Sequence, residues 1–181
     1  MNLPSQVLTE RLSIQRLKSE DAEEIFYAYA SKPEATKFVS WSTHRSINDT
    51  KAFLRSADDS WRKGTAYTFS VRLRIDSRMV GSFGVLNDQG KLQVGYVYGP
   101  LHWGRGYATE VCLSMIALLR RQPEVYRIQS FVDNENQASA GVLLKSGFIE
   151  EAKLPNWFRF INQGNQPKDC IQYRVPLEFS K

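Results

Sequence analysis

Alternating apolar and polar residues in the middle of the chain predict three consecutive strands. In residues 66–73 (AYTFSVRL) every second side chain is apolar, the pattern of a strand with one buried face. Residues 78–86 and 92–99 carry similar apolar runs, and the short segments RIDS and NDQG connect the three. Strands joined by such short turns pair as neighbours. We therefore predict an antiparallel meander over residues 66–99.

Apolar residues at helical spacing lie on both sides of this meander. Ser19 and Ser46 are the predicted N-caps of the first two helices, and Gly64 is the predicted end of the second. Four helices are expected in residues 19–32, 46–63, 104–122 and 136–146, and further strands in residues 8–17, 126–132, 148–154 and 170–177. The order is β-α-α-β-β-β-α-β-α-β-β. It predicts an α/β (α+β) fold in which helices flank a mixed sheet.

The composition fits one cytoplasmic enzyme-sized domain, residues 1–181. An apolar fraction of 42% is enough for a core without disulfides, and Cys112 and Cys170 have no metal-site spacing, so we expect reduced thiols and no metal. The net charge of +5 comes from dispersed basic residues, which makes a nucleic-acid partner unlikely and leaves ordinary surface or attraction to an anionic ligand open. No run reaches the roughly 20 apolar residues that cross a bilayer, so no membrane partner is expected.

The segment PLHWGRGYATEV, residues 100–111, joins the third strand of the meander to an amphipathic helix. A helix N-terminus has unpaired N–H groups and a partial positive charge, and glycines let the backbone approach a ligand closely. That combination suits phosphate oxygens. The segment has neither the GxGxxG pattern nor the Gly-Lys-Ser/Thr ending of nucleotide-binding loops, and a plain tight turn remains the alternative.

The segments VGYVYGPLHWGRGYATE (residues 94–110) and NENQASAGVLLKSGF (residues 134–148) together resemble two motifs of the GNAT superfamily of acyl-CoA-dependent N-acyltransferases. The likeness is to the Rim-type branch, whose members acetylate the N-termini of ribosomal proteins. It covers nearly the whole chain. It implies the GNAT fold, a mixed and mostly antiparallel sheet of six to seven strands flanked by about four helices.

The resemblance also implies a set of residues that bind coenzyme A. The pyrophosphate loop of the family, Gln/Arg-x-x-Gly-x-Gly/Ala, falls on residues 103–108, with Trp103 in place of the usual first residue. The amides of Arg105, Gly106, Tyr107, Ala108 and Thr109 would cradle the pyrophosphate, and Gly104 would allow the backbone to approach it. The preceding strand would be splayed from its parallel neighbour by a bulge at Gly95 or Gly99. The pantetheine arm would then pair with Tyr96, Val97 and Tyr98, and bind Asn136 and Ser139, while Lys145 would approach the adenosine phosphate.

The catalytic residues are less clearly marked. The family's usual acid is a tyrosine, and Leu143 stands at that position. We expect Ser139 beside the thioester sulfur to replace it, with Tyr96 and Tyr98 as alternatives. An N–H near Val97 or Tyr98 would stabilise the oxyanion. Helix capping is an equal explanation for Asn136 and Ser139.

Glu110 is the first candidate for the general base, ahead of Glu150 and Glu151. Its place in the first helical turn also has a purely structural explanation, because an acid is favoured there. His44 and His102 are expected to be non-catalytic. Asp169 and Tyr173 fit a pattern of the family's final strands and could hold the acceptor.

The resemblance therefore predicts an acetyl-CoA-dependent N-acetyltransferase that moves an acetyl group to a primary amine by direct attack on the thioester. The acceptor would be a protein N-terminus, such as that of a ribosomal protein. Two alternatives remain open. One is a small-molecule amine acetyltransferase acting on a polyamine, an amino acid or an aminoglycoside, and the other is a non-catalytic acyl-CoA-binding module. Either a monomer or a homodimer is compatible with the sequence.

Overall fold

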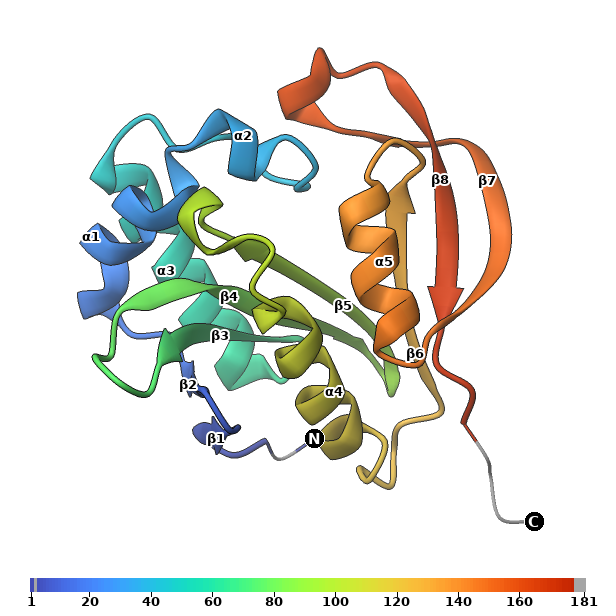
Figure 1. Ribbon diagram of the computed structural model, residues 1–181, viewed down its shortest axis with the longest axis horizontal. Coiled ribbons are helices and arrows are strands. Elements are labelled where there is room, and N and C mark those ends of the chain that lie inside the picture. The colour runs from blue at the N-terminus through green and yellow to red at the C-terminus, as the bar shows by residue number, and fades with distance from the viewer. Residues whose placement is uncertain (2, 178–181) are drawn as a thin grey trace.

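The computed structural model describes residue 1 and residues 3–177, and contains one mixed sheet of eight strands (Figure 1). In sheet order the strands are β1 (Gln6–Leu8), β2 (Leu12–Arg16), β3 (Ala66–Leu73), β4 (Met79–Asp88), β5 (Lys91–Tyr98), β6 (Arg127–Asp133), β8 (Pro167–Arg174) and β7 (Ile149–Arg159). Only the β5–β6 pair is parallel. The predicted meander is confirmed as β3–β4–β5. The strand count exceeds the predicted six to seven because of β1, which precedes the turn at residues 9–11 and lies almost entirely ahead of the strand predicted over residues 8–17, whereas β2 falls within it.

The helices lie on both faces of this sheet. They are α1 (Ala22–Ile25), extended by a π-helical turn over Phe26–Ala30, then α2 (Pro33–Thr36), α3 (Ile47–Lys63), α4 (Tyr107–Leu119) and α5 (Gln137–Lys145). Figure 1 shows α4 and α5 on one face and α3 on the other. Buried residues of α4, such as Val111 and Met115, belong to the same apolar cluster as Phe69 and Phe83 of the sheet. None of the helices in the described residues is long and apolar enough to cross a membrane.

The ends of α3 confirm their predicted signals. Ser46 and Asp49 form a capping box at its start, and Gly64 ends it with φ at +71°. The predicted cap Ser19 is wrong, because the N-cap position is Lys18, whose amide donates to the Asp21 carboxylate at 2.9 Å.

The parallel strands β5 and β6 separate soon after they begin to pair. Their pairing covers only residues 91–93 of β5 and 127–129 of β6. Beyond this point β6 continues to pair with β8, and Figure 1 shows α5 in front of the opening that results. The predicted splay is therefore present. The predicted bulge at Gly95 or Gly99 is not, because β4 and β5 pair in continuous register from Gly81 opposite Tyr98 to Asp88 opposite Lys91.

Candidate active site

Six consecutive main-chain amides, those of residues 104–109, have no acceptor among the described residues. The cap position of α4 is Gly106, with φ at +77° and no side-chain capping bond, and Gly104 has φ at +73°. The first amide of this region with a protein partner is that of Glu110, which donates to the Gly106 carbonyl at 3.1 Å. Both glycines occupy the left-handed region that other residues rarely adopt. The loop and the first turn of α4 thus present a row of donors suited to an anion.

A second set of donors lies on the edge of β5 that faces the opening. The Gly99 amide donates to the Val80 carbonyl at 2.9 Å, so it faces β4. Because residues along an antiparallel pair alternate between bonded and non-bonded positions, the Val97 amide also faces β4. The amides of Tyr96 and Tyr98 must then point towards the opening. Of the two predicted oxyanion donors, the register favours Tyr98 and excludes Val97.

Trp103 fastens the loop to the end of β5. Its indole Nε1 donates to the Tyr98 carbonyl at 2.8 Å, although half of the side chain is exposed. That carbonyl points into the opening, where β6 no longer supplies a partner. Tryptophan is therefore suited to the first loop position because its indole N–H reaches a backbone group that the splay leaves unpaired.

Ser139 and Tyr96 meet across the opening. The Tyr96 hydroxyl lies 2.8 Å from Ser139 Oγ and 3.1 Å from the Ser139 carbonyl oxygen. Asn136 caps α5, since its Oδ1 accepts a hydrogen bond from the Ser139 amide at 3.1 Å. The capping explanation is thus confirmed for Asn136, and its side-chain amide keeps two N–H groups for a ligand. These contacts connect the first turn of α5 to β5 through the Tyr96 side chain.

The two tyrosines of β5 are poor proton donors or acceptors at neutral pH. Burial raises the pKa of Tyr96 far above its ordinary value, despite the opposing hydrogen bond from Ser139. Burial also raises the pKa of Tyr98, whose hydroxyl has no partner among the described residues. Both hydroxyls therefore stay protonated. The Tyr98 main-chain amide faces the opening, while its hydroxyl lies in the core.

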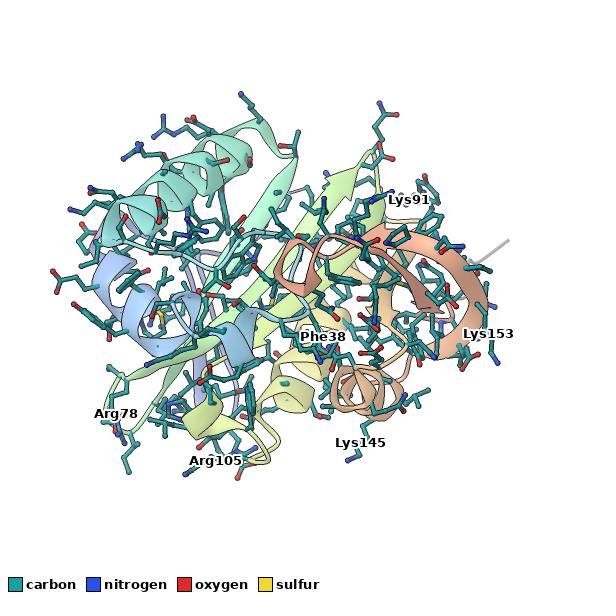
Figure 2. All side chains as sticks on the ribbon, turned by 90° about the horizontal axis from the view of Figure 1, so that it is seen from above. Phe38, Arg78, Lys91, Arg105, Lys145 and Lys153 are labelled. Atoms are coloured by element: carbon teal, nitrogen blue, oxygen red, sulfur yellow. The ribbon has the colours of Figure 1, made fainter. Side chains whose placement is uncertain are left out.

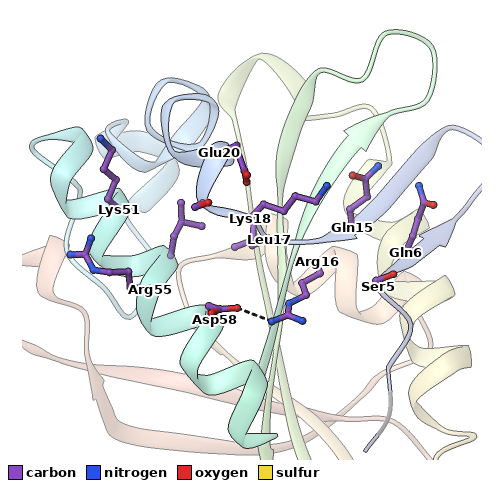
Figure 3. A pocket seen from close by; sticks show the side chains of 12 residues that line it. Ser5, Gln6, Gln15, Arg16, Leu17, Lys18, Glu20, Lys51, Arg55 and Asp58 are labelled. Carbon is purple, nitrogen blue, oxygen red and sulfur yellow. Dashed lines mark hydrogen bonds and ion pairs between the residues drawn. The ribbon is translucent and has the colours of Figure 1, made fainter.

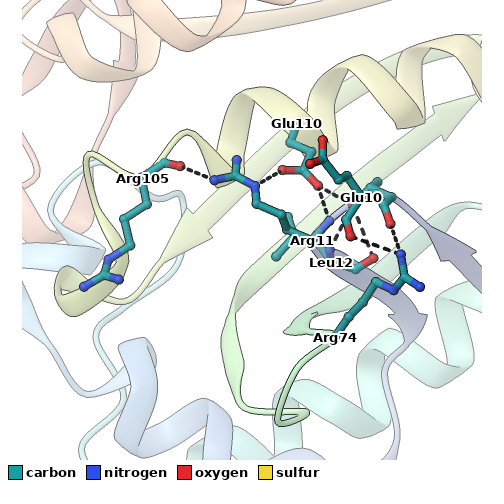
Figure 4. A network of polar contacts seen from close by, with 7 residues as sticks. Glu10, Arg11, Leu12, Arg74, Arg105 and Glu110 are labelled. Atoms are coloured by element: carbon teal, nitrogen blue, oxygen red, sulfur yellow. Dashed lines mark hydrogen bonds and ion pairs between the residues drawn. The ribbon is translucent and has the colours of Figure 1, made fainter.

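Both carboxylate oxygens of Glu110 accept hydrogen bonds from residues of the β1–β2 turn (Figure 4). One carboxylate oxygen accepts bonds from the Thr9 hydroxyl at 2.6 Å and the Arg11 amide at 2.9 Å, and the other accepts the Arg11 guanidinium at 2.7 Å. Burial alone would raise the pKa of Glu110, but these hydrogen bonds outweigh it and hold the pKa below its ordinary value. A carboxylate so stabilised is a weak base. The geometry argues against the predicted catalytic role of Glu110.

Lys145 and the two histidines lie in three separate places, at the end of α5, beside the loop and at the start of α3. Lys145 is exposed at the C-terminal end of α5, on the same side of the molecule as Arg105 in Figure 2. Burial and the nearby Arg105 lower the pKa of His102. Burial also lowers the pKa of His44, whose Nδ1 lies 2.8 Å from the Thr50 hydroxyl. Contact of Lys145 with an adenosine phosphate stays a prediction.

The β7–β8 turn reaches the segment that precedes α3 through Asn162, a residue that carried no signal in the sequence. Its Nδ2 donates to the carbonyls of Thr36 at 2.7 Å and Trp41 at 2.9 Å, and its Oδ1 accepts from the Thr43 amide at 3.0 Å. These bonds connect two segments 119 residues apart in sequence. Asn162 thus ties the β7–β8 turn to the segment between α2 and α3.

Asp169 and Tyr173, the two residues predicted to hold the acceptor, have structural environments of their own. Asp169 Oδ1 accepts the amide of Asn156 at 2.8 Å, within an irregular stretch of β7 where Asn156 has φ at +49°. Tyr173 is buried, at 2% exposed. Asp169 therefore stabilises the bend of β7 while remaining exposed, whereas the Tyr173 side chain is not presented to solvent.

A pocket of about 850 Å³ lies away from this site, between the β1–β2 edge and α3 (Figure 3). Its charged lining residues include Lys18, Lys51 and Arg55, and Arg16 paired with Asp58. It touches neither the α4 loop nor the edge of β5 that faces the opening. No group of three or more metal-binding side chains occurs within the described residues either.

The comparison with protein families decides the assignment. Residues 11–149 match the acetyltransferase (GNAT) domain family, a span that includes the loop, the splayed strands and α5. The chain belongs to the GNAT acetyltransferase family. Its class is therefore that of an acyltransferase, as the sequence predicted.

Known proteins similar to this GNAT chain include the uncharacterized N-acetyltransferase p20 of Bacillus licheniformis, 27% identical, with 82% of this chain and 85% of p20 covered. Among solved structures, the Microcin C7 self-immunity acetyltransferase MccE, in complex with acetyl-CoA and AMP, aligns with a TM-score of 0.87 and 16% identity over 97% of this chain and 98% of that one. A Salmonella typhimurium acetyltransferase that modifies the N-terminal serine of ribosomal protein L7/L12 aligns with a TM-score of 0.83 and 13% identity over 94% and 97%. At these identities the structures share the fold.

Proposed function

We propose that this protein is an acetyl-CoA-dependent N-acetyltransferase acting on a primary amine. The observation that carries the proposal is the row of six unpartnered amides at the start of α4, continuous with the unpaired edge of β5. A diphosphate fits the first set of donors, and a peptide-like pantetheine arm fits the second. The solved complex of MccE with acetyl-CoA is consistent with this donor.

The residues of the opening account for the chemistry without a covalent enzyme intermediate. Acetyl transfer needs an amine placed about 3–3.5 Å from an already activated carbonyl. The Tyr98 amide would stabilise the oxyanion of the tetrahedral intermediate. As the C–S bond breaks, the Ser139 hydroxyl would donate a hydrogen bond to the departing sulfur, and the proton lost by the amine would pass to the thiolate to give the free thiol of coenzyme A. Both groups lie on rigid elements, β5 and α5, and Ser139 is oriented by Tyr96 at 2.8 Å.

The acceptor best supported by the charges is a singly charged amine such as a protein N-terminus. A polycation would need several free carboxylates, but those near the start of α5 have protein partners. Asp133 accepts the Glu135 amide and the Gln163 side chain, each at 2.9 Å, and Glu135 pairs with Lys168 at 2.5 Å. A ribosomal-protein N-terminus would follow the Rim-type neighbours, and such an enzyme would work in the cytoplasm.

An assay of thiol release from acetyl-CoA tests the proposal. Purified protein would be incubated with separate pools of N-terminal peptides, polyamines, amino acids and aminoglycosides. We expect release with the peptide pool and weak release with polycations. Coenzyme A binding in calorimetry without turnover of any pool would instead indicate a non-catalytic acyl-CoA-binding module. Absence of both binding and turnover would overturn the proposal.

A further inference from the structure

Arg11 contacts both the loop at residues 103–108, here called the coenzyme loop, and the first turn of α4 that follows it (Figure 4). Its Nε donates to the Glu110 carboxylate at 2.7 Å, and its Nη1 donates to the Arg105 carbonyl at 3.0 Å. The guanidinium also lies over the Tyr107 ring, 4.8 Å from the ring centroid. One side chain from the β1–β2 turn thus holds the loop, the first residue of α4 and the carboxylate one turn further on.

The turn that carries Arg11 is held firmly. The Thr9 and Leu12 amides are both bonded across it, to the Leu12 carbonyl at 2.9 Å and the Thr9 hydroxyl at 3.0 Å. Arg74 donates to the carbonyls of Thr9 at 2.8 Å and Glu10 at 3.0 Å. Because the turn is fixed in this way, Arg11 loses little further backbone freedom when it engages the loop.

The bond to Arg105 determines where an anion-binding amide points. In a planar trans peptide, the C=O and the next N–H point in opposite directions. When Arg11 holds the Arg105 carbonyl towards the β1–β2 turn, the Gly106 amide is directed away from it, outwards from the loop. The left-handed conformation of Gly106 permits this orientation.

The bond to Glu110 removes an electrostatic conflict. A carboxylate in the first turns of a helix competes with any anion bound at the same N-terminus, because both are attracted by the helix dipole and repel each other. Arg11 neutralises this carboxylate and, together with Thr9, occupies both of its oxygens. Without Arg11, Glu110 would repel a bound diphosphate.

We propose that Arg11 is a positioning residue for diphosphate binding, which orients the Gly106 amide and cancels the charge of Glu110. This inference rests on the proposed function, because it assumes that coenzyme A is the ligand. It assigns Glu110 to the support of the loop and gives the N-terminal turn a role in donor affinity.

Calorimetry with coenzyme A tests this role with Arg11→Ala, Glu110→Gln and the double variant. Loss of charge-assisted hydrogen bonds predicts a Kd about 10- to 100-fold higher for Arg11→Ala. The double variant should bind about two- to fivefold more tightly than Arg11→Ala, because the repelling carboxylate is gone. Arg11→Lys should fall between wild type and Arg11→Ala, since an ammonium retains the charge but lacks the guanidinium fork.

Arg16 supplies a matched control (Figure 3). It also pairs with a carboxylate at 2.7 Å, that of Asp58, and lies over an aromatic ring, Trp61, at 4.8 Å. Arg16→Ala should reduce stability to a similar degree and leave the coenzyme A Kd unchanged. Transfer from acetyl-pantetheine, which lacks the diphosphate, should be equal in wild type and Arg11→Ala.

The outcomes separate the two proposals. If wild-type protein binds no coenzyme A, the proposed function fails. If wild type binds and Arg11→Ala binds as tightly as Arg16→Ala, the role of Arg11 is refuted and the proposed function stands. An equal loss of activity with acetyl-CoA and acetyl-pantetheine would likewise reduce Arg11 to a general structural residue.

Discussion

The Tyr96 and Ser139 hydroxyl oxygens lie 2.8 Å apart and join β5 to the first turn of α5. The pair fixes the Ser139 hydroxyl relative to β5, the strand whose Tyr96 and Tyr98 amides are unpaired. Tyr96 cannot itself supply a proton readily, because burial raises its pKa. Its function in the pair is to hold the serine in place.

Replacing Ser139 with alanine should slow transfer and leave donor binding almost unchanged. Loss of a hydrogen-bond donor to the departing sulfur predicts a kcat lower by roughly 10²-fold, the lower end of acid–base contributions. Steady-state kinetics and calorimetry with coenzyme A measure the two quantities. Tyr96→Phe should lower kcat less, while Tyr67→Phe, which loses a hydroxyl bond to the Met1 carbonyl, serves as the control. Full activity of Ser139→Ala would remove the serine from the mechanism.

Alanine at Gly104 should weaken donor binding beyond its effect on stability. A residue with a Cβ at φ +73° costs about 1 kcal/mol, and relief of that strain would move the loop amides. Gly164 is a close control: its φ is +71°, and an added Cβ would meet nothing within 4 Å at either glycine. Denaturation should show similar losses for both variants, and only Gly104→Ala should raise the coenzyme A Kd. Similar Kd values for the two would contradict the assignment of the loop.

Replacing Trp103 with phenylalanine should weaken the attachment of the loop to the end of β5 without creating a cavity in the core. The change removes the 2.8 Å bond to the Tyr98 carbonyl, a contribution of about 0.5–1.5 kcal/mol, so the coenzyme A Kd should rise about 2- to 12-fold. Trp157 is 53% exposed against 52% for Trp103, and Trp157→Phe is the comparison variant. An unchanged Kd for Trp103→Phe would show that the indole N–H does not hold the loop.

The lowered pKa of Glu110 predicts a pH-dependent contribution to stability. A carboxylate whose folded-state pKa lies below its unfolded value of about 4.5 stabilises the fold above that pH, and the contribution disappears as the pH falls through the folded-state pKa. Urea denaturation should therefore separate wild type from Glu110→Gln at pH 7, and the difference should shrink as the pH falls below about 4.5. The acid limb of the kcat/KM profile should coincide for the two proteins. A shifted limb would restore Glu110 as a general base.

Much of the fold could be read from local patterns. Turn residues and period-two alternation identified β3–β4–β5, and the Ser46 and Gly64 signals located α3. The strand β1, residues 6–8, was not predicted, because its pairing with β2 depends on a turn in which Thr9 bonds to Leu12. The eighth strand therefore came from a local contact that hydrophobicity does not encode.

The part of the site that depends on backbone conformation could be predicted from the sequence. The part that depends on hydrogen bonds between residues distant in sequence could not. Glycines before an amphipathic helix indicated the loop, and the structure leaves its amides unpaired. Glu110 was misread because its partners, Thr9 and Arg11, lie 101 and 99 residues away in sequence. Asn162 was missed for the same reason: an asparagine near a turn has no pattern that reveals which distant carbonyls it contacts.

Asn162 should influence the acceptor and leave the donor unaffected. Its three bonds tie the β7–β8 turn to residues 36–43, so Asn162→Ala frees that turn, which we expect to contact the acceptor. We expect the acceptor KM to rise several-fold, which corresponds to a loss of about 1 kcal/mol in acceptor binding. The acetyl-CoA KM should be unchanged. Asn87 also bridges two backbone groups, the Gly64 carbonyl at 2.8 Å and the Gly90 amide at 2.9 Å, at a distant turn, so Asn87→Ala controls for lost stability. Equal acceptor KM values in the two variants would exclude the β7–β8 turn from the acceptor site.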